Sequence, residues 1–264
     1  MSISERFSNG CRFIAEKILW IIIIPIALDL TNLLSWEKIY HTAYNPLQKI
    51  FMIKLGFIGA PPSVNYLLED FPAPLFKYDS SGFSGILNRF GIFNVSFFIT
   101  VILILSFLHS GYMSIVGSDS EEKASRRDFF IKGNKNWHKF FLLDCIIWFP
   151  LLLMVFNKNF ILLSFVSVIF VYVQYSFVKD EVGIKENFKL GIKFLFNNLG
   201  LTVKLAIYLG LIFSLLSLII FPLTRLGNVG VIIDIVICAY LGTGANRLVL
   251  EVYSADENDI NVSL

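Results

Sequence analysis

The feature that most constrains this chain is a set of long stretches without a charged residue. Residues 90–118, 159–178 and 205–224 contain no Asp, Glu, Lys or Arg. At a rise of about 1.5 Å per residue, each is long enough for a helix to cross a hydrocarbon core about 30 Å thick. Composition agrees, because 56% of the 264 residues are hydrophobic and 16% are charged, against about 25% charged in an ordinary soluble domain. The sequence predicts an all-α integral membrane protein.

Three further apolar windows are each interrupted by one acid. They are 18–35 with Asp29, 140–157 with Asp144, and 226–246 with Asp234. All six windows are continuously apolar and lack the alternation of a membrane barrel strand. We therefore predict six transmembrane helices, arranged as three hairpins.

The distribution of Lys and Arg predicts the orientation in the cell membrane. Segments 1–17, 119–139 and 179–204, with Arg247, hold 15 of the 22 basic residues. Since basic residues are enriched on the cytoplasmic side, both termini are expected in the cytoplasm. The long segment 36–91 is then an external loop. Its apolar stretches, 50–58 and 83–92, are too short or too interrupted to span, and we expect them to lie on the outer surface.

One pattern recurs before the first, third and fifth predicted spans. The copies are Ser2-x-x-Glu5-x-Phe7-x-x-Gly10-x-Arg12, Ser125-x-x-Asp128-x-Phe130-x-x-Gly133-x-Lys135 and Gly183-x-x-Glu186-x-Phe188-x-x-Gly191-x-Lys193. Ser three residues before an acid is typical of a capping box at a helix start. The remaining positions predict an amphipathic helix, in which the glycine permits close approach to another helix or to the bilayer.

This recurrence predicts a threefold internal repeat within one membrane domain, residues 1–264. The repeat units would cover about 2–118, 125–178 and 183–253, each a cytoplasmic interfacial helix followed by a hairpin. The expected partner of the three amphipathic helices is the bilayer, with anionic headgroups on its cytoplasmic side. Basic, Phe-rich segments beside spans are common, however, and such a pattern also arises without a true repeat.

Six spans and the acidic-x-Phe-x-x-Gly segments before spans three and five resemble a broad group of prokaryotic membrane proteins. That group is related to the membrane domain of glycerophosphoryl diester phosphodiesterases. Residues 119–255 carry most of the likeness. The resemblance implies a six-span membrane domain only, because no stretch outside the spans could build the catalytic barrel. It carries over neither hydrolytic activity nor any functional residue.

The intramembrane acids are the candidate polar site. Asp29 and Asp234 each lie five or six residues from the outer end of a predicted span, about 8–9 Å deep. If those spans are neighbours, the two carboxylates could share a proton or a cation. Alternatively, each reaches water or caps a neighbouring helix. Asp144 lies near the cytoplasmic end of its own span.

These observations favour a non-enzymatic multi-pass membrane protein, a scaffold or accessory factor. The alternative is a small-solute or ion transporter that uses the intramembrane Asp residues. We expect no catalytic residues, no metal site, no cofactor and no nucleic-acid partner; other membrane proteins or a second copy could bind. The three cysteines, Cys11, Cys145 and Cys238, are expected to act as small hydrophobic residues.

Overall fold

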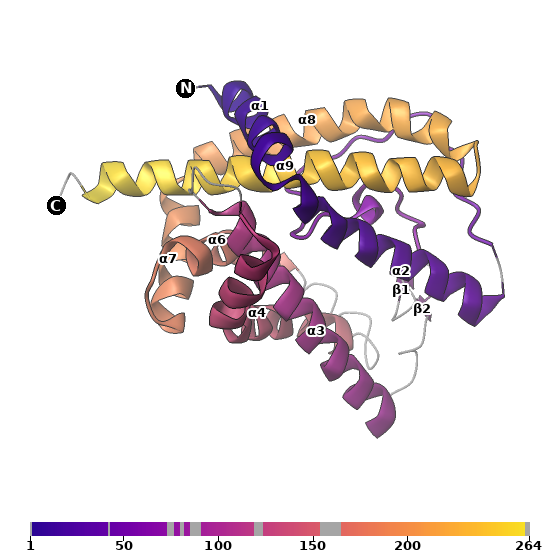
Figure 1. The fold of residues 1–264 in the computed structure, drawn as a ribbon, viewed down its shortest axis with the longest axis horizontal. Coiled ribbons are helices and arrows are strands. Elements are labelled where there is room, and N and C mark those ends of the chain that lie inside the picture. The colour runs from indigo at the N-terminus through magenta and orange to yellow at the C-terminus, as the bar shows by residue number, and fades with distance from the viewer. Residues whose placement is uncertain are drawn as a thin grey trace. The chain divides into compact units, whose positions relative to one another are not determined.

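A computed structural model describes residues 2–41, 43–72, 77–79, 82–84, 91–118, 124–153 and 165–261. The regular secondary structure of this part of the chain is helical apart from one short antiparallel hairpin, in which β1 (Lys77–Asp79) pairs with β2 (Gly82–Ser84) (Figure 1). The chain divides into two compact units. Unit 1 comprises residues 1–72, 118–124 and 198–264, and unit 2 comprises 73–117 and 125–197.

Unit 1 is built on four α-helices. They are α1 (Ile3–Phe13), α2 (Ile23–Tyr40), α8 (Leu199–Thr224) and α9 (Asn228–Asn261). A π turn (Ile14–Ile18) and a 3-10 turn (Leu19–Ile22) carry α1 into α2. A tight turn that contains Gly227, at a φ of 64°, joins α8 to α9. The two helices contact one another, as Figure 1 shows.

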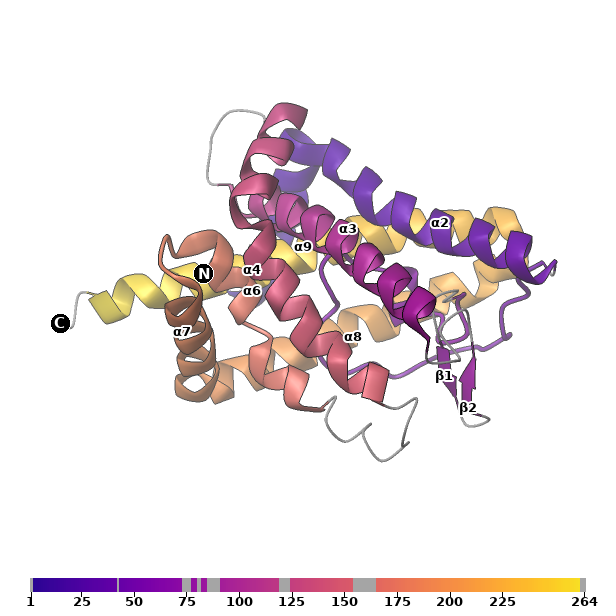
Figure 2. The same cartoon turned by 90° about the horizontal axis from the view of Figure 1, so that it is seen from below.

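Unit 2 contains α3 (Ile92–Val116), α4 (Arg126–Leu153), the short α6 (Val173–Lys179) and α7 (Ile184–Asn197). A 3-10 helix, Phe165–Phe170, precedes α6. Figure 2 shows α4 beside α3 and α7 beside α6, and both pairs are in contact.

Four helical paths are long and apolar enough to cross a membrane. They are Ile3–Ile39, Ile92–Val116, Leu199–Thr224 and Asn228–Ala255. The chain is therefore a multi-pass membrane protein, as predicted. The predicted spans 140–157 and 159–178 fall partly on residues 154–164, outside the described residues. The count of six spans and the orientation of the termini stay predictions.

The predicted capping boxes begin two of the motif helices. The Glu5 amide donates to Ser2 Oγ (3.2 Å), and the Ser2 amide donates to Glu5 Oε2 (2.8 Å). Ser125 and Asp128 repeat this exchange at 3.3 and 2.8 Å. The hydrogen bond from the Ser125 amide also lowers the pKa of the Asp128 carboxyl. The spacing of Ser and acid thus set the start of both helices.

The three motif glycines lie at close helix crossings. A methyl group at Gly10 would lie 3.2 Å from the Gly244 carbonyl oxygen, within unit 1. In unit 2, a methyl group at Gly133 would lie 3.1 Å from Gly111 Cα. One at Gly191 would lie 2.7 Å from Val173 Cα. Each glycine therefore lets its helix approach another helix, one of the two roles predicted for it.

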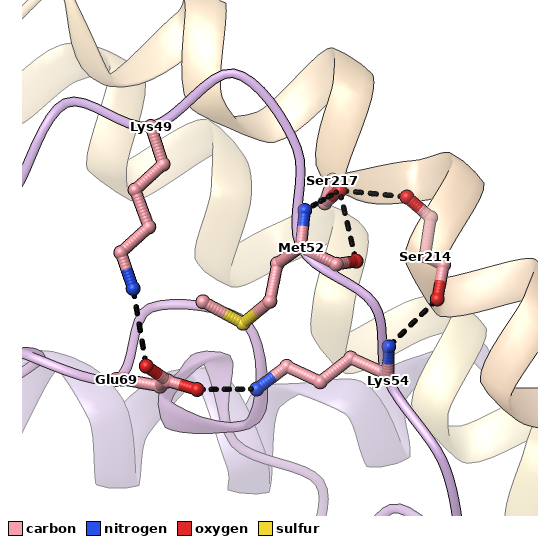
Figure 3. A network of polar contacts seen from close by, with 6 residues as sticks. All are labelled: Lys49, Met52, Lys54, Glu69, Ser214 and Ser217. Carbon is pink, nitrogen blue, oxygen red and sulfur yellow. Dashed lines mark hydrogen bonds and ion pairs between the residues drawn. The ribbon is translucent and has the colours of Figure 1, made fainter.

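The prediction that residues 50–58 lie on the outer surface is wrong, because this stretch runs along α8. The amides of Met52 and Lys54 donate to the Oγ atoms of Ser217 (3.0 Å) and Ser214 (2.8 Å) (Figure 3). The Gly56 amide donates to the Ala206 carbonyl (3.3 Å). The outermost of these α8 partners, Ala206 and Ser217, lie 11 positions apart, or about 16 Å of helix. We call residues 50–66 the inserted segment. The other apolar stretch of the predicted external loop, 83–92, falls largely on residues outside the described ranges.

The inserted segment is extended here, and its side chains alternate. Met52 and Lys54 are the residues whose amides face α8, whereas Ile53 and Leu55 are 81% and 74% exposed. Apolar side chains on the exposed face suit contact with lipid. The apolar residues of this stretch therefore belong to an extended segment that lies beside a helix. The sequence predicted a segment on the outer surface instead.

We expect Gly210→Ala to displace the inserted segment. A methyl group there would lie 2.5 Å from the Lys54 carbonyl oxygen, a backbone atom that cannot turn away. Overpacking of this kind should lower the free energy of unfolding by about 1–3 kcal/mol, measured by denaturant unfolding in detergent.

Gly200→Ala is the matched control in the same helix, because nothing lies within 4 Å of its added methyl group. It should change stability by less than about 1 kcal/mol. Equal stability of the two variants would contradict the described contact between Gly210 and Lys54.

Candidate functional site

The inserted segment turns back across α9 after its contact with α8. Asn246 Nδ2 donates to the Gly59 carbonyl (3.1 Å), and the Cys238 thiol donates to the Ser63 carbonyl (3.4 Å). Between them, Gly242 contacts Pro62 so closely that a side chain there would overlap it. The small residues of α9 thus admit a segment of backbone, in addition to the helix α1.

Asp29, on α2, holds the returning end of the inserted segment. Its Oδ1 accepts from Ser63 Oγ (2.7 Å), and its Oδ2 accepts from the Val64 amide (2.8 Å). The carboxylate is 2% exposed. It therefore accepts hydrogen bonds at the start of the 3-10 turn Val64–Tyr66. This matches the predicted alternative that Asp29 caps a neighbouring helix.

Asp234, on α9, has a different environment. The residue is fully buried, and neither carboxylate oxygen has a hydrogen-bond partner among the described residues. Asp234 and Asp29 both lie close enough to the Cys238 thiol to act on it electrostatically. Asp29 and Asp234 thus both lie near the Cys238 thiol, but among the described residues only Asp29 accepts hydrogen bonds.

Tyr44 joins this region from the start of the external loop. Its hydroxyl is buried, and the Asp70 carboxylate acts on it. Burial, followed by the carboxylates of Asp70 and Asp234, raises the pKa of the phenol. Tyr44 is therefore a neutral hydroxyl close to Asp234. Nothing in the sequence around Tyr44 marks it, because its place depends on how the loop folds back.

Three charged residues, one of which lies within the inserted segment, hold the loop in place (Figure 3). Glu69 pairs with Lys49 Nζ at 3.1 Å and with Lys54 Nζ at 3.3 Å. The hydrogen bond from Lys49, with help from Lys54, holds the pKa of Glu69 below its ordinary value. The Lys54 ammonium also lies 5.4 Å from the centre of the Tyr66 ring, a cation–π distance. We call Lys49, Lys54 and Glu69 the loop clasp.

Asp144 lies in unit 2 and forms part of a separate polar network. Ser106 Oγ donates to Asp144 Oδ2 (2.7 Å), and His109 Nδ1 lies 3.4 Å from Asp144 Oδ1. His109 Nε2 lies 3.0 Å from Gln174 Oε1. Sequence reasoning passed over His109 because it has no ligand-like spacing. An ionisable residue inside a charge-free window was the signal that could have found it.

The other motif residues contact protein. Phe7 packs edge-on against Tyr208 at 6.1 Å, and Phe188 packs against Phe177 at 5.7 Å. Phe130 lies 5.4 Å from Phe129.

The basic motif residues form ion pairs. Arg12 pairs with Glu16 at 2.8 Å, and Lys135 pairs with Glu181 at 2.7 Å. Exposed pairs of this kind contribute only about 0–1 kcal/mol, so they orient side chains more than they stabilise the fold. Contact with anionic headgroups, including contact through Lys193, stays a prediction.

Within the described ranges, no group of three His, Cys, Asp or Glu side chains could hold a metal ion. The three cysteines are free thiols. Comparison of the chain with family models, with curated proteins and with solved structures finds no significant match.

The two acids should respond differently to replacement by the isosteric amide. Asp29→Asn presents an NH₂ group where one of two donors is now bound, and should lower the free energy of unfolding by about 1–3 kcal/mol. Asp234→Asn breaks no hydrogen bond with the described residues and should leave stability unchanged or raise it. Thermal unfolding in detergent compares the pair directly. A loss for Asp234→Asn as large as that for Asp29→Asn would contradict the described environment of Asp234.

The loop clasp should weaken in acid. Because the pKa of Glu69 is depressed in the folded protein, its stabilising effect is complete above the ordinary value of 4.5 and disappears as the pH falls below it. We expect wild type to be more stable than Glu69→Gln at pH 7, with a difference that shrinks below about pH 4.5. Thermal unfolding of both proteins across this range measures that difference. A difference independent of pH would contradict the clasp.

Proposed function

We propose that this protein is a membrane transporter that binds a proton or a small cation at Asp234 and moves it across the bilayer. The observation that carries the proposal is the fully buried Asp234 carboxylate, which has no hydrogen-bond partner among the described residues. A scaffold or accessory factor, the other function predicted from the sequence, has no need of such a group.

The burial of Asp234 has an energetic consequence. A bare carboxylate in an apolar interior costs several kcal/mol, so Asp234 must be neutralised by a bound proton or cation. Ionisable residues inside membrane helices are rare for this reason, and they mark ion and proton pathways. Reversible neutralisation of Asp234 is the elementary binding step of the proposed transport.

The inserted segment supports the same function. Non-helical backbone at membrane depth is tolerated where protein buries it or where it lines a water-filled cavity. Transporters use such segments to present carbonyl groups and helix ends to an ion. Here the segment passes beside α8 and α9, and the Ser63 carbonyl faces Cys238, one helical turn beyond Asp234.

The proposed transporter has a particular membrane topology. We infer six spans, cytoplasmic termini and three repeat units, and the three glycine crossings support the repeat. The helix that meets each motif glycine carries a similar stretch at the crossing: Gly111-Tyr-Met-Ser-Ile-Val, Val173-Gln-Tyr-Ser-Phe-Val and Gly244-Ala-Asn-Arg-Leu-Val. Internal repeats are frequent in transporters. The resemblance to phosphodiesterase membrane domains stays a prediction.

Flux through reconstituted protein tests the proposal. Proteoliposomes loaded with pyranine would report protons, and external radioactive sodium would report a cation, both under a potential set by potassium and valinomycin. We expect wild type to conduct one of the two above protein-free liposomes, and Asp234→Asn to return flux to that background.

Ser114→Ala is the matched control, because Ser114 Oγ is the other buried helix side-chain atom without a hydrogen-bond partner in the described residues. It should keep wild-type flux. Wild-type protein without flux of either probe, or Asp234→Asn with full flux, would overturn the proposal and favour the scaffold.

A further inference from the structure

Unit 2 contains a chain of four polar side chains across three helices. It runs from Ser106 on α3 to Asp144 on α4, then to His109 on α3 and Gln174 on α6. Ser106 is fully buried, and His109 and Asp144 are each 8% exposed. The function proposed above uses none of these residues.

The groups around His109 define its electrostatic setting. From α4, Asp144 faces the ring, the Cys145 thiol lies near Asp144, and the Phe140 ring centre is 4.6 Å from the imidazole centre. From α6, Gln174 faces the ring and also interacts with the Tyr175 phenol.

Lys139, the cation next to Phe140 on α4, is directed elsewhere. Its ammonium donates to Asn187 Oδ1 and to the Val182 carbonyl, each at 3.0 Å. Asp144 is the charged side chain that faces the His109 ring.

The imidazole ring lies between two oxygen atoms. One nitrogen faces a carboxylate oxygen of Asp144, and the other faces the amide oxygen of Gln174. Only the doubly protonated ring can donate to both oxygens. A neutral ring with its proton on Nδ1 would set the Nε2 lone pair against the Gln174 oxygen. That repulsion disappears if the amide turns and presents its NH₂ group instead.

We propose that His109 and Asp144 form a proton-binding site in unit 2, and that Gln174 turns its amide when the proton binds. The incoming proton adds to His109 Nε2, Asp144 balances the positive ring, and Gln174 presents its oxygen. On release, the proton leaves Nε2 and Gln174 presents NH₂. This site goes beyond the proposed function, because it stands whether or not Asp234 conducts.

The surroundings of α6 confine the response to the Gln174 side chain. Asn187 Nδ2 donates to the Ser176 carbonyl (3.1 Å), to Ser176 Oγ (3.0 Å) and to the Asp180 carbonyl (3.1 Å). These bonds fasten α6 to α7. The helix is thus held two residues beyond Gln174, and rotation of the amide is the adjustment that the site requires.

Magnetic resonance can follow both partners, because the chain has three histidines and only two glutamines, Gln48 and Gln174. Full-length protein carrying His41→Asn and His138→Asn retains His109 as its one histidine. With ¹⁵N-labelled His and Gln, the ring nitrogens of His109 report protonation of the imidazole as the pH is varied. The Gln174 amide signals should change with the same midpoint, while Gln48 stays constant.

His109→Phe should hold the Gln174 amide signals constant across the same range. Asp144→Asn, which keeps the hydrogen-bonding shape but removes the charge, should make the common midpoint differ from that of wild type. A His109 ring that does not titrate, a Gln174 signal that stays constant while His109 titrates, or one that still changes in His109→Phe would each overturn the proposal.

Discussion

The structure of unit 1 depends on one constraint: backbone amides beside membrane helices must find partners within the protein. The inserted segment meets it with side chains and backbone of its neighbours. Ser214 and Ser217 donate their own hydroxyl protons to carbonyls of α8 at 2.6 Å and accept the amides of Lys54 and Met52. Each serine thereby serves the helix and the segment at once. Asp29 does the same for the Val64 amide.

The same constraint separates the roles of the buried acids. Asp29 and Asp144 accept hydrogen bonds, and both stabilise the placement of a neighbouring element. Asp234 accepts none among the described residues, so its carboxylate does not hold a neighbouring element in place. Asp234 is therefore the acid to which we assign a function. The sequence alone could not have distinguished the environment of Asp234 from that of Asp29. Both are single acids at similar depth in apolar windows.

Local patterns in the sequence predicted what depends on local physics. Charge-free windows predicted the long helices, and Ser-x-x-acid spacing predicted the starts of α1 and α4. The close approach of Gly10 and Gly133 to other helices was also expected from their place in the motif. What failed was the path of residues 50–58, since its partners on α8 lie about 160 residues away. His109 was also missed, because it has no ligand-like spacing and its partners Asp144 and Gln174 are 35 and 65 residues distant.

The central claim is that extended backbone lies protected along α8 and α9, and hydrogen exchange of the protein in lipid nanodiscs tests it most directly. The amides of Met52, Lys54, Gly56 and Val64 are hydrogen-bonded, so exchange in peptides that cover residues 50–66 should be slowed for these positions. Exchange of all four amides at the rate of an unstructured chain would contradict the account.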